Sequence, residues 1–229
     1  GADVTLGDGC SLHHHATVEG FTQLGPQCEV FPFAVIGGRT QDLKARPGKP
    51  GLKVGARNTF REYVTIHSAT GDGETTLVGS RNHILAYCHL AHNVTLGSHV
   101  IMSNVATLAG HVTVEDHAVI GGLAAVHQFC RIGSHSITAI GTVVLQDIPP
   151  FVTASGNTAR PFGINSEGLK RRGFSADAIT RIKRAYKTLY KSGLGMEDAR
   201  NEIEAMTAEC AQLQLLTDFL GASTRGIIR

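Results

Sequence analysis

Apolar residues recur at every sixth position along most of this chain. They form one run before residue 37 and a longer run after residue 77, namely Leu6, Leu12, Val18, Leu24, Val30 and Ile36, then Val78, Ile84, Leu90, Leu96, Met102, Leu108, Val114, Ile120, Val126, Ile132 and Val144. The residue four positions after each of them is mostly small. A period of six fits neither a 3.6-residue helix nor one long alternating strand. It predicts short strands separated by tight turns, with both kinds of residue pointing into a common core.

Three such hexads would form one triangular coil of 18 residues, with a short strand on each face. Glycine often follows the aliphatic residue, as in LGD, LGP, VGS and IGG, and would permit tight corners. Successive coils would then stack about 4.8 Å apart. The repeat covers about residues 3 to 148 and resembles the hexapeptide repeat of left-handed parallel β-helix proteins. The expected fold class is mainly β, with a left-handed parallel β-helix followed by a small α-helical C-terminal domain.

Two polar segments, 37–52 and 69–76, interrupt the repeat and are expected to project as loops. The repeat ends at DIPP, where two prolines should stop strand pairing. We expect a β-helix domain over residues 1–150 and a helical domain over 151–229, in which Ser175 caps a helix and further helices occupy 196–210 and 212–220. Because the chain begins in repeat phase and without methionine, we expect further coils before Gly1.

Charge and cysteine content narrow the choice of partners and compartment. Lys and Arg number 21 against 19 Asp and Glu, so the net charge of +2 gives no reason to expect nucleic acid or an anionic membrane. No apolar run approaches the roughly 20 residues of a transmembrane helix, and no signal-peptide pattern is present. Five cysteines at irregular spacing are expected to be small buried side chains in a reducing compartment. A cytoplasmic location is therefore expected.

The histidines fall into groups when they are compared by their phase in the 18-residue coil. His99, His117 and His135 are 18 positions apart and should form a solvent-facing ladder, and His13, His14 and His15 should be exposed. His92, His111, His127 and Gln128 should converge on one edge across three coils, with His89 one turn away. Such a cluster suits either a zinc site with three converging ligands or acid–base catalysis by one histidine. The spacing alone leaves both open.

Longer motifs make the resemblance more specific. They are QDLK (41–44), REYVTIH (61–67), AYCHLAHNVTLG (86–97), NVATLAGHVTV (104–114), IGGLAAVHQFCRIG (120–133), GNTARPFGINSEGLKRRGFS (156–175) and STRGIIR (223–229). With them the chain resembles the bacterial UDP-N-acetylglucosamine acyltransferases, a family of hexapeptide-repeat acyltransferases. The resemblance implies a homotrimer with active sites between neighbouring β-helices. It also implies transfer of an (R)-3-hydroxyacyl chain from acyl carrier protein to the 3-hydroxyl of UDP-N-acetylglucosamine, the first step of lipid A synthesis, without a metal or other cofactor.

The same resemblance assigns roles to individual residues. His92 matches the general base, and Gly110 matches the residue whose backbone N–H stabilises the developing oxyanion. The residues that match substrate-binding positions are Asp42, Lys44, His67, His89, His111, His127, Gln128, Asn165, Glu167, Arg171 and Arg172. A basic tail that includes Arg160, Lys170, Lys183 and Arg184 could meet the acidic carrier protein.

Two positions depart from the family pattern. Asn93 stands where the family often has an aspartate beside the base; an amide oxygen can orient the imidazole but does not stabilise the imidazolium as a carboxylate does, and the exchange can favour the wrong tautomer. Ile140 matches the position that limits the acyl chain, where glycine admits a long one. A branched side chain there predicts a shorter acyl chain.

Three alternatives remain. A relative that acylates a UDP-sugar carrying a 3-amino group would share the same motifs. A zinc carbonic anhydrase on this fold would need three ligands at one edge. A purely structural or ice-facing solenoid would show flat threonine ladders instead of histidines and polar loops.

Overall fold

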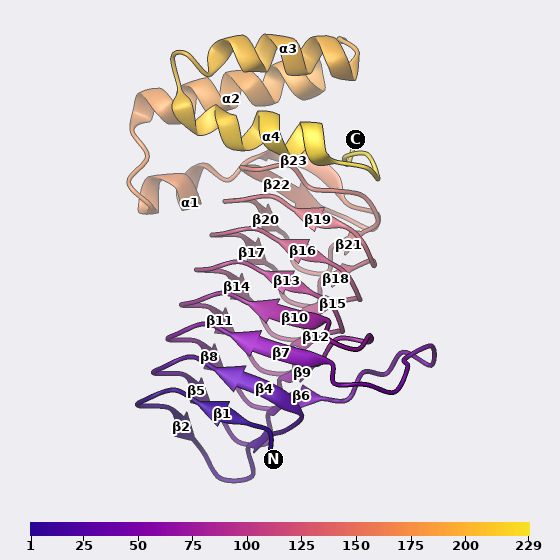
Figure 1. Cartoon of the computed structure of the whole chain (residues 1–229). Helices are drawn as coiled ribbons and strands as arrows, with labels where there is room; N and C mark the ends of the chain where they lie inside the picture. The colour runs from indigo at the N-terminus through magenta and orange to yellow at the C-terminus, as the bar shows by residue number, and fades with distance from the viewer.

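The hexads form short parallel strands that wind into a triangular column. The structure is a computed structural model that describes residues 1–229, and it places the strands in three parallel sheets with four α-helices at the C-terminal end (Figure 1). The predicted left-handed parallel β-helix is confirmed. The chain runs from sheet A to sheet B to sheet C in each coil, so that three corners, A–B, B–C and C–A, extend along the column.

The bounds of the strands follow the hexads closely. Sheet A contains β1 (Thr5–Leu6), β4 (Phe21–Leu24), β7 (Gly51–Val54), β10 (Thr75–Val78), β13 (Thr95–Leu96), β16 (Thr113–Val114) and β19 (Arg131–Ile132). Sheet B contains β2 (Ser11–Leu12), β5 (Glu29–Val30), β8 (Thr59–Phe60), β11 (His83–Ile84), β14 (Ile101–Met102), β17 (Val119–Ile120), β20 (Ile137–Thr138), β22 (Val152–Ser155) and β23 (Arg160–Ile164). Sheet C contains β3 (Thr17–Val18), β6 (Val35–Gly38), β9 (Thr65–His67), β12 (His89–Leu90), β15 (Thr107–Leu108), β18 (Ala125–Val126) and β21 (Val143–Val144).

The strand register keeps the 18-residue period except at the two interruptions. Thr95 pairs with Thr113, whereas Ile36 pairs with Ile66 and Val54 with Val78, because loops are inserted there. Strand pairing extends to Gly38 and resumes at Gly51, so the first loop is shorter than the predicted 37–52; the second likewise ends before β10 begins at Thr75. Both loops project from one side of the column (Figure 1).

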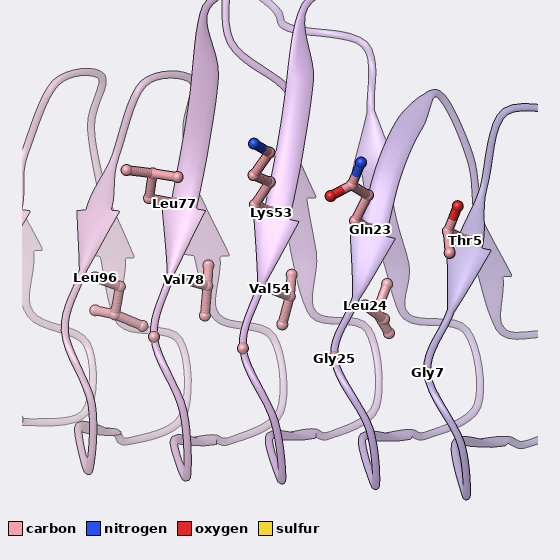
Figure 2. Close-up of a pocket in the computed structure, with 12 residues that line it drawn as sticks. Thr5, Gly7, Gln23, Leu24, Gly25, Lys53, Val54, Leu77, Val78 and Leu96 are labelled. Carbon is pink, nitrogen blue, oxygen red and sulfur yellow. The ribbon is translucent and has the colours of Figure 1, made fainter.

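The core follows the predicted inward positions. Its 36 buried residues include the repeated aliphatics from Val18 onward, and Cys28, Cys88 and Cys130 are buried among them as free thiols. Leu6 and Leu12 were expected in the core but are 43% and 42% exposed, because β1 and β2 have a neighbouring strand on one side only; Cys10 is partly buried. At the A–B corner, glycine lets successive coils approach: a Cβ on Gly25 would lie 2.6 Å from the carbonyl carbon of Gly55. Figure 2 shows this glycine row beside the outward side chains of Thr5, Gln23, Lys53 and Leu77.

Strand pairing in sheet B continues beyond Pro149 and Pro150, contrary to the stop expected at DIPP. β20 pairs with β22 in parallel, and β22 pairs with β23 in antiparallel orientation. The division of the chain at residue 150 therefore remains a prediction, since sheet B crosses it.

The helices are α1 (Ser166–Arg171), α2 (Ala176–Lys191), α3 (Met196–Met206) and α4 (Gln214–Ala222), with a 3₁₀ turn at Ala211–Leu213. As predicted, Ser175 caps α2, because its hydroxyl accepts a hydrogen bond from the Ala178 N–H at 3.1 Å. The helices enclose a second core of 13 buried residues, and Tyr186 of α2 also joins the main core. Measured by length and apolar character, every helix falls short of what crossing a bilayer requires.

We predict that the free energy of unfolding depends on the side chains stacked in the core. Leu108 is fully buried, so Leu108→Ala should lower the free energy of unfolding by about 2–5 kcal/mol because it leaves a cavity between coils. Leu77, which is 42% exposed on the outer face, is the matched control, and Leu77→Ala should cost less than about 1 kcal/mol. Urea unfolding at one fixed protein concentration measures both; equal losses would contradict the inward assignment.

Candidate active site

Seven of the predicted site residues gather at or beside the C–A corner, namely Asp42, His67, His89, His92, Asn93, Gly110 and His111. His92 lies in the turn between β12 and β13, and its ring meets that of His111 edge to face, with centroids 5.2 Å apart. The rings of His67 and His89, at the end of β9 and in β12, have centroids 4.8 Å apart. Asp42 reaches the cluster from the first loop, with its Oδ2 3.9 Å from His92 Nε2. The cluster therefore combines three coils and one loop.

Gly110 leaves the space that the His92 ring occupies. A Cβ on Gly110 would lie 2.5 Å from His92 Nε2, so any side chain there would displace the imidazole. The carbonyl of Gly110 accepts a hydrogen bond from Phe129 N–H at 3.2 Å, while its own N–H has no acceptor within the chain. A free backbone donor therefore lies beside the imidazole.

Asn93 determines which nitrogen of His92 carries the proton. Its Oδ1 accepts hydrogen bonds from the backbone N–H of Thr70 at 3.2 Å and from the Thr70 hydroxyl at 3.0 Å. A backbone N–H can only donate, so the atom facing it must be the amide oxygen. His92 Nδ1 lies 3.0 Å from the same oxygen and must therefore be protonated. Nε2 is left with a free lone pair, so Asn93 selects the tautomer that a base requires.

Glu74 holds the other end of this amide. Asn93 Nδ2 donates to Glu74 Oε2 at 2.8 Å, and the backbone N–H of Gly71 donates to the same oxygen at 3.0 Å. The hydrogen bond from Asn93 is the main cause that lowers the pKa of Glu74. Neither Glu74 nor Thr70 was among the site residues predicted from the sequence. Both lie in the second loop, and a loop outside the hexad register gives no phase from which to place them.

The first loop is folded around Asp42. Its Oδ1 accepts a hydrogen bond from the Lys44 N–H at 2.8 Å, and its own N–H donates to the Thr40 hydroxyl at 3.1 Å. The Lys44 side chain is exposed and makes no ion pair. A cavity of about 420 Å³ lies between the two loops, lined in part by Arg39, Thr40, Arg46, Ser68 and Thr70.

His67 and His89 are kept neutral by their surroundings. Burial first, and then the neighbouring rings of His67 and His92, lower the pKa of His89 to about 4. Burial also lowers the pKa of His67, with a smaller contribution from His92. The Thr65 hydroxyl lies 2.7 Å from His89 Nδ1. Both rings are thus suited to hydrogen bonding rather than to charge neutralisation.

His127 and Gln128 lie one coil farther along the same corner, and neither is hydrogen-bonded to the histidines of the cluster. Both are exposed, and Nδ1 of His127 lies 3.1 Å from the backbone carbonyl oxygen of Gln128. Their neighbour Phe129 stacks on His111 with centroids 4.7 Å apart. The corner therefore continues as an open surface beyond His111.

The remaining predicted binding residues lie elsewhere in the chain. Asn165 caps α1, and both of its polar atoms are engaged, with the carbonyl of His135 at 2.9 Å and the N–H of Gly168 at 3.1 Å. Glu167 pairs with Lys170 at 2.8 Å, and Arg171 is exposed. Arg172 is half-buried; its Nη1 has no partner, and burial lowers its pKa. α1 lies on the opposite side of the column from the two loops (Figure 1), so one chain does not unite the two groups.

Ile140 and the histidine ladder occupy the other corners. Ile140 is 76% exposed at the B–C corner. Sheet C separates this corner from His92, and its outward positions there are His89, Thr107, Ala125 and Val143. At the A–B corner the rings of His99, His117 and His135 stack in parallel, 4.7 Å apart at each step. Within this one chain, no group of three or more His, Cys, Asp or Glu side chains is placed to hold a metal ion.

A groove of about 600 Å³ lies on the face of sheet A (Figure 2). Its lining contains no histidine or carboxylate, and its single charged side chain is Lys53. We therefore assign the candidate site to the smaller, polar corner that contains His92.

Fold and site together are those of a hexapeptide-repeat acyltransferase. Residues 147–228 match the family model "Udp N-acetylglucosamine O-acyltransferase; Domain 2". The acyl-[acyl-carrier-protein]–UDP-N-acetylglucosamine O-acyltransferase of Janthinobacterium sp. (strain Marseille) is 51% identical over 206 residues, 88% of this chain and 79% of that protein. The chain belongs to the UDP-N-acetylglucosamine O-acyltransferase family.

Solved structures agree with this assignment. LpxA from Acinetobacter baumannii matches with a TM-score of 0.94 and 40% identity, over 99% of this chain and 88% of that one. LpxA from Bacteroides fragilis matches with a TM-score of 0.94 and 32% identity, over 99% and 96% of the two chains.

The neutral state of His89 makes a prediction for pH-dependent stability. Its folded-state pKa of about 4 lies below the roughly 6.5 of an unfolded histidine, so its contribution is fully present above pH 6.5 and is lost as the pH falls towards 4. His89→Gln should therefore reduce the loss of stability across that interval. Thermal unfolding of wild type and variant from pH 8 to pH 4 tests this. Measurements at pH 8 are the internal reference, because His89 is neutral there in both the folded and the unfolded chain. An unchanged pH dependence would contradict a buried, neutral His89.

Proposed function

We propose that this chain transfers an (R)-3-hydroxyacyl group from acyl carrier protein to the 3-hydroxyl of UDP-N-acetylglucosamine, the first step of lipid A synthesis, in the cytoplasm. The observation that carries the proposal is the His92 imidazole, whose Nδ1 is held protonated by Asn93 and whose Nε2 is free beside Gly110. The names of the relatives support both substrates, because they specify acyl carrier protein and UDP-N-acetylglucosamine.

His92 Nε2 would remove the proton from the sugar hydroxyl as its oxygen attacks the thioester carbonyl carbon. The carbonyl oxygen becomes an oxyanion, which the free N–H of Gly110 would stabilise. When the C–S bond breaks, the imidazolium returns the proton to the departing thiolate. The products are the 3-O-acylated sugar nucleotide and the free thiol of the carrier protein.

The binding residues are proposed in two groups. Asp42, Lys44, His67, His89 and His111 would hold the sugar and diphosphate around His92, and His127 and Gln128 would line the open corner beyond. The unpaired Arg39 and Arg46 in the neighbouring cavity suit an anionic substrate. The uridine diphosphate part would be recognised by Asn165, Glu167, Arg171 and Arg172. Asn165 already makes two hydrogen bonds within the chain, so only its remaining donor and acceptor positions are open to the substrate.

Because these groups lie on different sides of one chain, we infer a homotrimer in which α1 of one copy approaches the His92 corner of its neighbour. A symmetric assembly would complete three identical sites from incomplete ones. The separation of α1 from the loops supports this arrangement (Figure 1).

The alternative that the acceptor carries a 3-amino group retains the same site and the same base. Turnover of UDP-N-acetylglucosamine and of its 3-amino analogue in one assay distinguishes the two reactions.

Loss of the base should abolish most turnover. His92→Ala should lower kcat about 10²–10⁴-fold with UDP-N-acetylglucosamine and (R)-3-hydroxyacyl carrier protein, because no other group removes the proton. His99→Ala, which removes a histidine from the A–B corner, is the matched control and should retain kcat. Undiminished kcat in His92→Ala would rule out this base.

Ile140 should limit the acyl chain. A chain that starts at His92 and crosses the small outward side chains of sheet C would meet Ile140 at the next corner, so the wild-type enzyme should prefer short donors. Ile140→Gly should shift the preference towards longer donors by about fourfold in kcat/KM for each additional buried methylene. Ile140→Leu is the control that keeps the bulk. Wild-type preference for the longest carrier-bound donors would refute the role of Ile140.

A further inference from the structure

The side chains of Glu74 in the second loop and Asn93 beside His92 are joined by a hydrogen bond. The Glu74 carboxylate oxygen Oε2 accepts hydrogen bonds from Asn93 Nδ2 at 2.8 Å and from Gly71 N–H at 3.0 Å. Asn93 itself is fixed from its backbone, whose N–H donates to the Thr76 hydroxyl at 2.8 Å. The carboxylate and the amide therefore hold one geometry.

A continuous hydrogen-bonded series connects the carboxylate to the imidazole. The Asn93 amide donates to Glu74 through nitrogen and accepts from His92 Nδ1–H through oxygen, at 3.0 Å. An anion bonded to the amide N–H₂ draws electron density towards the amide oxygen, and hydrogen bonds in such a series strengthen one another. The oxygen facing His92 thus carries more negative charge than that of an isolated amide.

We propose that Glu74 is a positioning residue that acts on His92 through Asn93, holding the amide in the orientation that fixes the base tautomer and supplying the negative charge that stabilises the imidazolium. The inference rests on the proposed function, in which His92 is the general base. No covalent step involves Glu74, and its carboxylate stays ionised throughout.

The other charged and titratable groups around His92 have different placements. Asp42 Oδ2 lies on the opposite side of the ring, 3.9 Å from Nε2, where the substrate hydroxyl would enter. The His111 ring meets the His92 ring edge to face. His67 and His89 lie close enough for electrostatic interaction with His92, but burial keeps both of them neutral. Glu74 is thus the carboxylate on the Nδ1 side.

The first measurement is the pH dependence of kcat/KM in the full chain. Glu74→Gln keeps an acceptor for Asn93 and removes the charge, so kcat should fall about three- to tenfold and the acidic limb of the profile should move to lower pH, because the imidazolium is less favoured. Asp72→Asn is the matched control: it removes a charge from the same loop, where Asp72 bonds only the Lys49 N–H, and should leave the limb unmoved.

The second measurement separates positioning from simple support of the loop. Asn93→Asp places a carboxylate directly beside His92, so in that background the charge of Glu74 is no longer needed. Adding Glu74→Gln to Asn93→Asp should leave kcat unchanged or raise it, since it removes the repulsion between two adjacent carboxylates. An equal loss of kcat from Glu74→Gln in both backgrounds, or an acidic limb that does not move, would overturn the inference.

Failure of the proposed function is recognised separately. Wild-type enzyme without acyl transfer, or full activity in His92→Ala, would remove the base itself. Normal wild-type turnover with a silent Glu74→Gln would remove only the inference about Glu74. Thermal unfolding of each variant checks that a loss of activity does not reflect loss of the fold.

Discussion

The stacking of one coil on the next is the constraint on which the rest of the molecule depends. Backbone hydrogen bonds join strands 18 residues apart, and the inward aliphatics of consecutive coils fill a common core. Because each coil repeats the path of the previous one, a turn residue meets its equivalents above and below. The rings of His111 and Phe129, 18 residues apart, stack for this reason. His92 meets the His111 ring because its own equivalent in the next coil, Gly110, has no side chain and leaves room for the imidazole. The candidate site lies where the two loops and Gly110 interrupt this regular stacking at the C–A corner.

The regular part of the site could be predicted from the sequence, because phase in the coil is a property of spacing. His92 and His111 were expected on one edge, and the structure brings them together. Spacing alone does not say which residues of the corner bond to one another: His127 and Gln128 share the corner, but neither is hydrogen-bonded to the histidines of the cluster. The position of a residue in the 18-residue coil predicts the corner on which it lies. Whether two residues at that corner bond to each other depends on side-chain length and ring orientation.

The loops could not be placed in the same way. Their residues have no partner at a fixed offset, so nothing in the spacing shows that Asp42 and Glu74 reach the same turn from opposite sides. The start of α2 was easier to predict, because helix capping by Ser175 depends only on residues close to it in the sequence. The relation of the helical part to the His92 cluster was harder to predict, because α1 lies on the opposite side of the column from the two loops (Figure 1). Assembly is a property of surfaces, which the periodicity of a core does not encode.

Asn93 shows how a departure from a pattern changes meaning once its neighbours are known. Considered alone, an amide beside the proposed base offers either of two atoms to the imidazole and no charge. In the structure the Thr70 N–H requires the oxygen to face inward, and the Glu74 carboxylate requires the nitrogen to face outward, so a single orientation satisfies both. The negative charge is present but lies one residue farther from the ring. Because Glu74 is exposed, water screens it more than it would a buried aspartate in direct contact, so the same arrangement should orient His92 fully while stabilising its charged form less.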